Sequence, residues 1–208
     1  DILWIGARTT VNPFSVQEIA DAIKGTDTPV LIKNPINPDL SLWMGAIERI
    51  NKAGINKIGA IHRGFSMTGK SKYRYVPMWK IAIDLMSSMP ELPVICDPSH
   101  ICGNRDMIFE TSQKAIDLGY DGLIIESHID PDNAWSDAKQ QVTPEILSKI
   151  KSDLRTKNNK EDDKSHKHLL DEIRDDIDDV DKEVIDIISK RIQLVEKIGE
   201  FKKEQDLT

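Results

Sequence analysis

Cysteine, basic charge and long apolar runs are all scarce in this sequence. Its 208 residues include two cysteines, Cys96 and Cys102, too few for the disulfide framework of a small secreted domain, so we expect a reducing, cytoplasmic setting. No run of about 18 apolar residues occurs, which argues against a membrane span. The formal net charge is −7 without a basic cluster, so no nucleic-acid partner is expected.

The acidic charge is concentrated toward the end of the chain. Residues 156–208 carry 11 Lys and Arg against 16 Asp and Glu, a net −5, which leaves −2 for the first 155 residues. Residues 156–166, TKNNKEDDKSH, contain no aliphatic side chain and are typical of a linker. We therefore predict two folded parts, residues 1–155 and 167–208, joined by a linker over 156–166.

Residues 1–155 repeat one supersecondary unit. Short, nearly all-apolar segments begin near Ile2, Pro29, Lys57, Pro93 and Gly122, and a helical pattern of roughly ten to sixteen residues follows each. Strands that alternate with helices form a parallel sheet, and strands covered on both faces are apolar throughout. The sequence therefore predicts an α/β fold with five βα units.

Local signals define the expected ends of these helices. Ser15, followed three residues later by Glu18, is typical of a capping box and predicts that the first helix begins there. Gly54 and Gly119 are expected to end their helices, because glycine readily adopts the left-handed conformation that follows a helix.

Five βα units are compatible with two architectures. They can be part of a (β/α)8 TIM barrel, in which case about three further units would precede Asp1. They can also form an open, doubly wound sheet, which the number of strands alone permits. The barrel is favoured, because an open parallel sheet would leave two long strand edges to be covered.

Cationic side chains follow the first three predicted strands. Arg8, Lys33 and the pair His62–Arg63 occupy these positions, and the carboxyl ends of barrel strands open onto one face. Arg binds phosphate or carboxylate through paired hydrogen bonds and Lys adds a compact charge, so together they predict an anion site. Each cation alone could equally pair with a structural carboxylate. For His62, and for His128 after the fifth strand, a wall residue and a catalyst both remain open.

Metal-binding side chains follow the last two predicted strands. Asp97 and His100 lie in the turn DPSH after the fourth strand, Glu126 follows the fifth, and Asp137 lies 11 residues further on. One histidine and two carboxylates, His100, Glu126 and Asp137, are a plausible set of nitrogen and oxygen ligands for a divalent metal ion.

Roughly residues 1–150 resemble the C-terminal five βα units of type Iβ 3-deoxy-D-arabino-heptulosonate 7-phosphate (DAHP) synthases. The motifs that carry the resemblance are, in order, GARTT, KNP, HRGF, DPSH and IIESHIDPDNAWSDAKQ. The resemblance implies that His100, Glu126 and Asp137 are three of four ligands of a divalent ion such as Mn²⁺. The fourth ligand of that family is a cysteine on the first barrel strand, which this chain does not contain; Cys96 is expected to pack in the core instead.

The same resemblance implies the substrate contacts. Arg8, Lys33 and Arg63 would bind the phosphate and carboxylate of phosphoenolpyruvate, and Asp97 would lie near the metal and the aldehyde substrate. Lys33 and Asp97 are the candidate catalytic residues, with Lys33 placed to act on protons near the substrate. The family's KPR(S/T) motif for erythrose 4-phosphate is absent, so this chain by itself is expected to be inactive.

Residues 167–208 are predicted to form one long helix. Apolar residues recur in alternating steps of four and three, interrupted once by Arg191. This segment resembles the first helix of the all-helical chorismate mutases, which implies that Arg174, Arg191 and Lys202 bind chorismate and that the helix packs with its twin in a homodimer. A coiled-coil dimerisation arm without catalytic function is the alternative.

Together, the two resemblances imply a bifunctional enzyme of aromatic amino-acid biosynthesis. It would condense phosphoenolpyruvate with erythrose 4-phosphate and rearrange chorismate to prephenate. Two other functions remain open: an enzyme that makes the eight-carbon 3-deoxy-octulosonate 8-phosphate, and a regulatory or scaffold module.

Overall fold

The computed structural model describes residues 1–156 and 163–204. The chain divides into two compact units, residues 1–156 and 157–208. Within the second unit, side chains are described for residues 181–202. Most of the expected linker, residues 157–162, lies outside the described residues.

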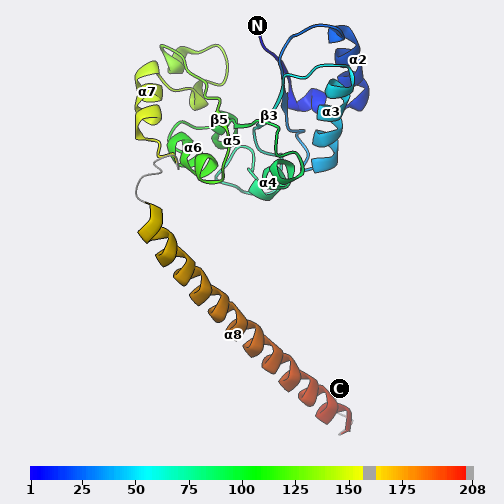
Figure 1. Cartoon of the computed structure of the whole chain (residues 1–208), viewed down its shortest axis with the longest axis vertical. Helices are drawn as coiled ribbons and strands as arrows, with labels where there is room; N and C mark the ends of the chain where they lie inside the picture. Colours follow the sequence, from blue (N-terminus) through cyan, green and yellow to red (C-terminus); the bar gives the residue numbers. More distant parts are fainter. Residues whose placement is uncertain (157–162, 205–208) are drawn as a thin grey trace. The chain divides into compact units, whose positions relative to one another are not determined.

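The N-terminal unit contains a parallel sheet of five strands in the order β1-β2-β3-β4-β5. Figure 1 shows β3 and β5 toward the middle of this unit, with helices around them. The strands are β1 (Leu3–Ile5), β2 (Val30–Lys33), β3 (Ile58–His62), β4 (Val94–Cys96) and β5 (Gly122–Leu123). A doubly wound sheet reverses its strand order at a switch point, whereas a barrel keeps the sequential order. The observed order is therefore that of a barrel segment, and the doubly wound alternative is wrong.

Helices follow the strands, as the alternating pattern predicts. They are α1 (Ala7–Thr10), α2 (Pro13–Ile23), α3 (Leu40–Lys52), α4 (Trp79–Ser88), α5 (Pro98–Cys102), α6 (Ile108–Asp117) and α7 (Pro144–Asp153), with 3-10 turns η1 (Pro131–Asn133) and η2 (Ala138–Gln140). The short helices α1 and α5 begin directly after β1 and β4. They therefore hold their side chains close to the carboxyl ends of these strands.

The core lies between the sheet and the longer helices. Alternate strand residues such as Val30 and Ile32 are fully buried, and they belong to one apolar cluster with Trp43 of α3. The indole N–H of Trp43 donates to the carbonyl of Ile32 at 3.1 Å, so this large ring is buried without an unsatisfied donor. Burial of this kind fixes the strand ends on which the candidate site is built.

The expected start of the first long helix is wrong. Helix α2 begins at Pro13, and the side chain of Asn12 accepts hydrogen bonds from the backbone N–H groups of Phe14 and Ser15. Asn is as good an N-cap as Ser, and a proline at the first helical position has no N–H to leave unpaired. These two signals prevail over the Ser15 capping box.

The expected helix ends are confirmed. Helix α3 ends at Lys52, and Gly54 has a φ of +92°; helix α6 ends at Asp117, and Gly119 has a φ of +87°. Both glycines adopt the left-handed conformation that terminates a helix.

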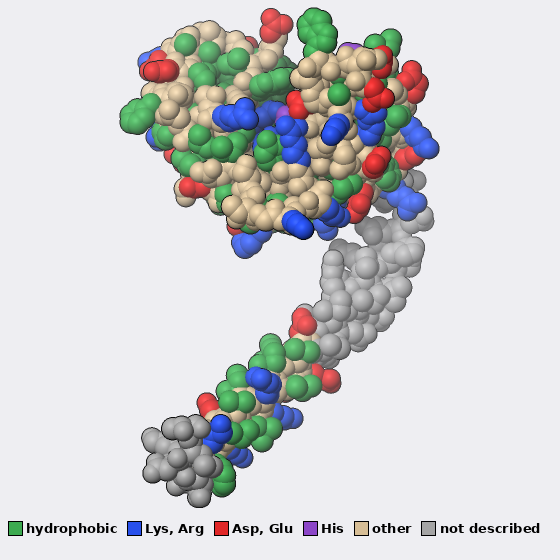
Figure 2. Space-filling model, turned by 180° about the vertical axis from the view of Figure 1, so that it is seen from behind, with side chains coloured by type: hydrophobic (Ala, Val, Ile, Leu, Met, Phe, Trp, Pro, Cys, Tyr) green, Lys and Arg blue, Asp and Glu red, His purple; other side chains and the backbone are tan. Residues whose placement is uncertain are grey.

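The described part of the second unit is one helix, α8 (Asp163–Glu204), which begins four residues before the expected Lys167. Every described side chain of this helix, from Asp181 to Lys202, is exposed, and apolar and charged side chains lie side by side on its surface (Figure 2). Among the described residues, no helix has both the length and the hydropathy needed to cross a membrane.

Candidate metal and anion site

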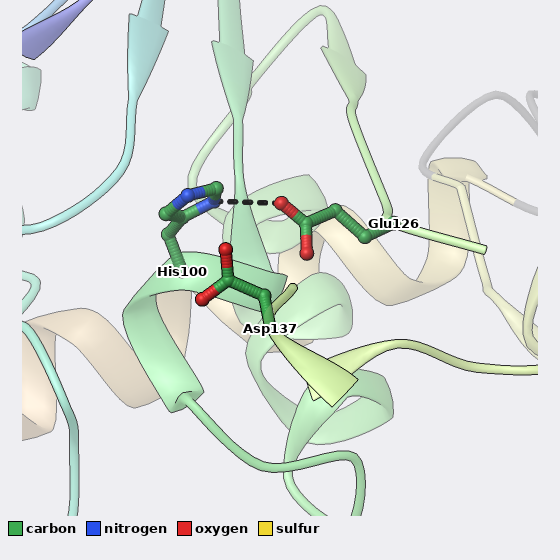
Figure 3. Close-up of side chains that lie close together, drawn as sticks. All are labelled: His100, Glu126 and Asp137. Carbon is green, nitrogen blue, oxygen red and sulfur yellow. Dashed lines mark ion pairs between the residues drawn. The ribbon is translucent and has the colours of Figure 1, made fainter. Parts of the chain in front are cut away.

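Three side chains from separate segments converge at the carboxyl end of the sheet. His100 lies on α5, Glu126 follows β5, and Asp137 directly precedes η2. Each offers one ligand atom, and these atoms lie within 4.8 Å of one another. The three side chains point toward a common centre (Figure 3). This arrangement is compatible with one bound cation.

His100 is held in place by the N-cap of its own helix. The carboxylate of Asp97 accepts the backbone N–H of His100 through Oδ1 at 3.0 Å. Nδ1 of His100 lies 2.9 Å from Oδ2 of Asp97 and 3.5 Å from Oε1 of Glu126. Neither contact has the direction of a hydrogen bond, so this buried ring nitrogen has no hydrogen-bond partner among the described residues.

Glu126 is fixed through its backbone. Its N–H donates to the hydroxyl of Ser99 on α5 at 3.0 Å, and its carbonyl accepts the N–H of Val142 at 3.1 Å. One side-chain oxygen, Oε2, accepts a hydrogen bond from the amide of Gln140 at 2.9 Å. The other oxygen is the one that faces His100.

Asp137 is the most constrained of the three ligand candidates. Its φ of +51° is the left-handed conformation, which few non-glycine residues adopt. Its Oδ1 accepts a hydrogen bond from Arg74 at 2.7 Å. This hydrogen bond holds the pKa of Asp137 below its ordinary value, although burial opposes the shift, so the group is a carboxylate at neutral pH.

These residues fit a divalent metal ion. One imidazole nitrogen and two carboxylates are ligands that first-row divalent ions such as Mn²⁺ accept. Neither cysteine belongs to the cluster: Cys96 is buried in the core, and Sγ of Cys102 lies 3.1 Å from the hydroxyl of Thr111.

Cations line a pocket of about 300 Å³ beside this cluster. The pocket brings together the three cations expected at the strand ends and two of the three ligand candidates, His100 and Asp137. Figure 2 shows Lys and Arg side chains near a histidine on one face of this unit. Its charged and aromatic lining consists of Trp4, Arg8, Lys33, Arg63, Arg74, Tyr75, His100 and Asp137. The pocket is therefore suited to an anion that also contacts a bound cation.

Arg63 is the strongest indication of an anion in this pocket. It is only 6% exposed, and its Nη1 has no hydrogen-bond partner among the described residues. Its guanidinium lies over the ring of Tyr75, 3.5 Å from the ring centroid. A buried guanidinium that is stacked on an aromatic ring and keeps an unsatisfied N–H donor can bind a carboxylate or phosphate oxygen.

Lys33 and Asp97 form an ion pair at the base of the site. Nζ of Lys33 lies 3.3 Å from Oδ2 of Asp97, and both side chains are largely buried. Burial alone would raise the pKa of Asp97, but His100 and Lys33 hold this pKa below its ordinary value. Asp97 is therefore a carboxylate at neutral pH.

The family assignment rests on the sequence as well as on this geometry. Residues 1–162 match the model of the DAHP synthetase I family. The chain belongs to this family. Residues 173–208 match the model of chorismate mutase type II.

Relatives of the DAHP synthetase I unit come from Thermotoga maritima. A phospho-2-dehydro-3-deoxyheptonate aldolase is 30% identical over 155 residues, which are 74% of this chain and 44% of that protein. A solved truncated form of DAHP synthase has a TM-score of 0.65 at 27% identity and covers 83% of this chain and 59% of its own. A second solved DAHP synthase has a TM-score of 0.65 at 29% identity, over 73% and 43% of the two chains. The chain thus spans about half the length of these relatives.

Neither of the two histidines left open lines the pocket. His62 is fully buried among Trp43, Phe65, Trp79 and Tyr120, with the Tyr120 hydroxyl 2.7 Å from its Nδ1. Burial lowers its pKa from 6.5 to about 4, so it is neutral in the folded protein at neutral pH. Nδ1 of His128 accepts the backbone N–H of Asp130 at 3.0 Å and stabilises a turn. These contacts favour the wall-residue interpretation for both histidines.

The expected mutase residues all lie on α8. The side chain of Arg174 lies outside the described side chains, whereas Arg191 and Lys202 are described and exposed. Eleven positions separate these two cations, which places them within about 20° of each other around an ideal helix.

Two polar residues of the site, Arg74 and Gln140, could not be identified from the sequence. Arg74 donates to Asp137, and it also donates to Gln140, which in turn donates to Glu126. Arg74 lies in the long loop between β3 and α4, where no periodic pattern marks it. Gln140 belongs to the AKQ segment next to Asp137, and its burial could not be read from the sequence.

Proposed function

We propose that this chain supplies the metal-binding and anion-binding part of an enzyme that condenses phosphoenolpyruvate with erythrose 4-phosphate and one water to give DAHP and phosphate. One observation carries the proposal: three metal-ligand candidates lie within 4.8 Å of one another beside a pocket lined by Arg8, Lys33 and Arg63. The phosphate and carboxylate of phosphoenolpyruvate are bound by cations of this kind. The aldehyde substrate needs a Lewis acid that polarises its oxygen. Membership of the DAHP synthetase I family supports the same reaction.

The cluster is proposed to hold a divalent ion such as Mn²⁺ through His100, Glu126 and Asp137. A metal ion in this position would act as a Lewis acid toward the aldehyde oxygen. The protein's own contribution is orientation: Asp97 fixes the helix that carries His100, and Ser99 fixes the backbone of Glu126. Orientation of this kind is what makes a metal centre effective.

The pocket is proposed to bind phosphoenolpyruvate through its phosphate and carboxylate. Arg63 offers a free, buried donor, Arg8 adds a second guanidinium, and Lys33 lies between the pocket and Asp97. Because Lys33 and Asp97 share one ion pair, a proton lost or gained by the substrate can be held at Nζ or at the carboxylate. This is the proposed catalytic role of Lys33 and Asp97.

The C-terminal unit is proposed to belong to a chorismate mutase that rearranges chorismate to prephenate. The match of residues 173–208 to chorismate mutase type II supports it, with Arg174, Arg191 and Lys202 as the cations that would bind the substrate carboxylates. The exposed apolar side chains of α8 support a homodimer formed through this helix. We also propose a cytoplasmic location, as for other enzymes of biosynthesis.

The 208-residue chain is proposed to bind ligands without turning them over. Its sequence contains neither a KPR motif nor a cysteine at the metal cluster, and its pocket offers cations for one phosphorylated substrate. The natural protein that carries this chain should therefore form DAHP, whereas residues 1–208 alone should bind Mn²⁺ and phosphoenolpyruvate.

The test is a substrate comparison with the natural protein in the presence of Mn²⁺. Release of phosphate from phosphoenolpyruvate is measured with erythrose 4-phosphate and, separately, with arabinose 5-phosphate. The proposal predicts a preference for the four-carbon sugar and loss of turnover in the His100→Ala variant. Preference for the five-carbon sugar, or full activity of His100→Ala, would contradict it.

A further inference from the structure

We propose that Arg74 is a positioning residue that aligns the three metal-ligand candidates before a cation binds, directly at Asp137 and through Gln140 at Glu126. This inference rests on the proposed function, in which His100, Glu126 and Asp137 hold a divalent ion. It assigns a role to the loop between β3 and α4, which supplies no ligand itself.

The backbone at Arg74 is attached to the helix that carries His100. The N–H of Arg74 donates to the carbonyl of Cys102 at 3.4 Å, and the N–H of Tyr75 donates to the carbonyl of Ile101 at 3.2 Å. Both carbonyls belong to the last turn of α5. The loop therefore follows α5 and cannot shift independently of it.

The stem of the Arg74 side chain packs against the residue that ends α5. Gly103 has a φ of +67°, and a Cβ atom added there would lie 2.5 Å from Cβ of Arg74 and 2.9 Å from its Cδ. Any side chain at this position would displace Arg74. The glycine thus permits both the left-handed turn and the close approach of the arginine.

The head of Arg74 joins the other two ligand candidates. Its Nη1 donates to Oδ1 of Asp137 at 2.7 Å and to Oε1 of Gln140 at 2.6 Å. Gln140 is 1% exposed, and its Nε2 donates to Oε2 of Glu126 at 2.9 Å. The orientation of the Gln140 amide is thereby fixed, because its oxygen faces Arg74 and its nitrogen faces Glu126.

This arrangement leaves ligand atoms available. Arg74 occupies only Oδ1 of Asp137 and Gln140 occupies only Oε2 of Glu126, so each carboxylate keeps a second oxygen for a cation. Asp137 also needs support, because its left-handed backbone is strained for a non-glycine residue. One guanidinium therefore links helix α5, the strained Asp137 and the buried Gln140.

The sign of the effect of Arg74 on metal affinity separates positioning from simple electrostatics. If the guanidinium acted only through its charge, its removal would strengthen cation binding, because a like charge near the ion would be lost. If it positions the ligands, its removal weakens binding. Loss of a residue that orients metal ligands typically reduces affinity by about 10- to 100-fold.

The experiment is a titration of the full 208-residue chain with Mn²⁺, followed by the electron paramagnetic resonance signal of the free and bound ion. We expect Arg74→Gln to lower the affinity about 10-fold or more and to broaden the spectrum of bound Mn²⁺. Arg74→Lys keeps the charge but cannot reproduce the planar fork, so it should also lose affinity. Gln140→Met, which keeps the Arg74–Asp137 pair and releases Glu126, should give an intermediate loss.

The control is Arg49→Gln, which removes the same charge from a guanidinium that donates to Gly45 within α3. It should leave the affinity and the spectrum unchanged. Tighter binding by Arg74→Gln, or wild-type binding by both Arg74→Lys and Gln140→Met, would overturn the positioning role. If Arg74→Gln does not fold, the Mn²⁺ affinity of Gln140→Met decides between the two outcomes. Failure of the wild-type chain to bind Mn²⁺ through His100 would instead refute the proposed function itself.

Discussion

Asp97 contacts His100 twice: Oδ1 accepts the backbone N–H of His100 at 3.0 Å, and Oδ2 lies 2.9 Å from Nδ1 of its ring. One carboxylate thus begins helix α5 and faces the metal-ligand candidate that this helix carries. Because the same Oδ2 lies 3.3 Å from Nζ of Lys33, Asp97 joins the anion pocket to the metal cluster. The carboxylate that caps helix α5 is therefore also the group that contacts the His100 ring and Lys33.

Removal of the Asp97 side chain is expected to cost more stability than removal of its charge. Asp97→Asn keeps an oxygen that can cap α5, whereas Asp97→Ala leaves the N–H of His100 without a partner. Asp97→Ala should therefore be less stable than Asp97→Asn by about 1 kcal/mol. Urea unfolding followed by tryptophan fluorescence measures this difference, since all four tryptophans lie in residues 1–156. Equal midpoints for the two variants would show that the cap contributes nothing.

Lys33→Met is expected to abolish DAHP formation by the natural protein while leaving Mn²⁺ binding intact. Lys33 lines the anion pocket and pairs with Asp97, but it is not one of the three ligand candidates. Phosphate release and Mn²⁺ titration measure the two effects separately. Unchanged turnover in this variant would refute the catalytic assignment of Lys33.

The buried His62 predicts a specific loss of stability in acid. Its pKa is 6.5 when unfolded and about 4 when folded, so the unfolded state binds the proton more tightly. Its contribution is fully present above pH 6.5 and is lost progressively as the pH falls toward 4. The total loss is about 3 kcal/mol, from the difference between the two pKa values. In unfolding experiments from pH 7 to pH 4, His62→Gln should lose less stability than the wild type by about this amount. Parallel pH profiles would mean that His62 is not buried in its neutral form.

Gly103→Ala is expected to destabilise the N-terminal unit more than a matched glycine substitution. Gly25 also has a positive φ, +80°, but an added Cβ would meet nothing there within 4 Å. Gly25→Ala should cost about 1–2 kcal/mol for the left-handed conformation. Gly103→Ala has the same cost and must also displace Arg74. Equal losses for the two variants, by the same fluorescence assay, would show that Arg74 is not packed against Gly103.

Arg191→Leu distinguishes the two interpretations of α8. Arg191 is the one interruption of the apolar series, so a leucine there should strengthen a helix that only dimerises. A mutase should instead lose activity, because a cation for a substrate carboxylate is gone. Prephenate formation by the natural protein and sedimentation equilibrium of the variant measure the two outcomes. Full mutase activity in Arg191→Leu would exclude its binding role.

The sequence predicts the strand ends well because their chemistry is local. Apolar strands alternate with helices, and in a parallel sheet this order alone brings His100 and Glu126 to one end. The role of Arg74 could not be predicted in the same way, because its contacts span 63 residues to Asp137 and depend on the packing of a loop against Gly103. His62 shows a second limit: it is the last residue of β3 and faces the core, whereas the neighbouring Arg63 is also buried but lines the pocket, and nothing in HRGF indicates which of the two takes which position.

The most direct test is a crystal structure of this chain grown with Mn²⁺, using the anomalous scattering of the metal to locate it. We expect one strong anomalous peak within bonding distance of His100, Glu126 and Asp137, with Arg74 still hydrogen-bonded to Asp137. The absence of an anomalous peak near these three residues, or a peak bound by other residues, would contradict the metal assignment.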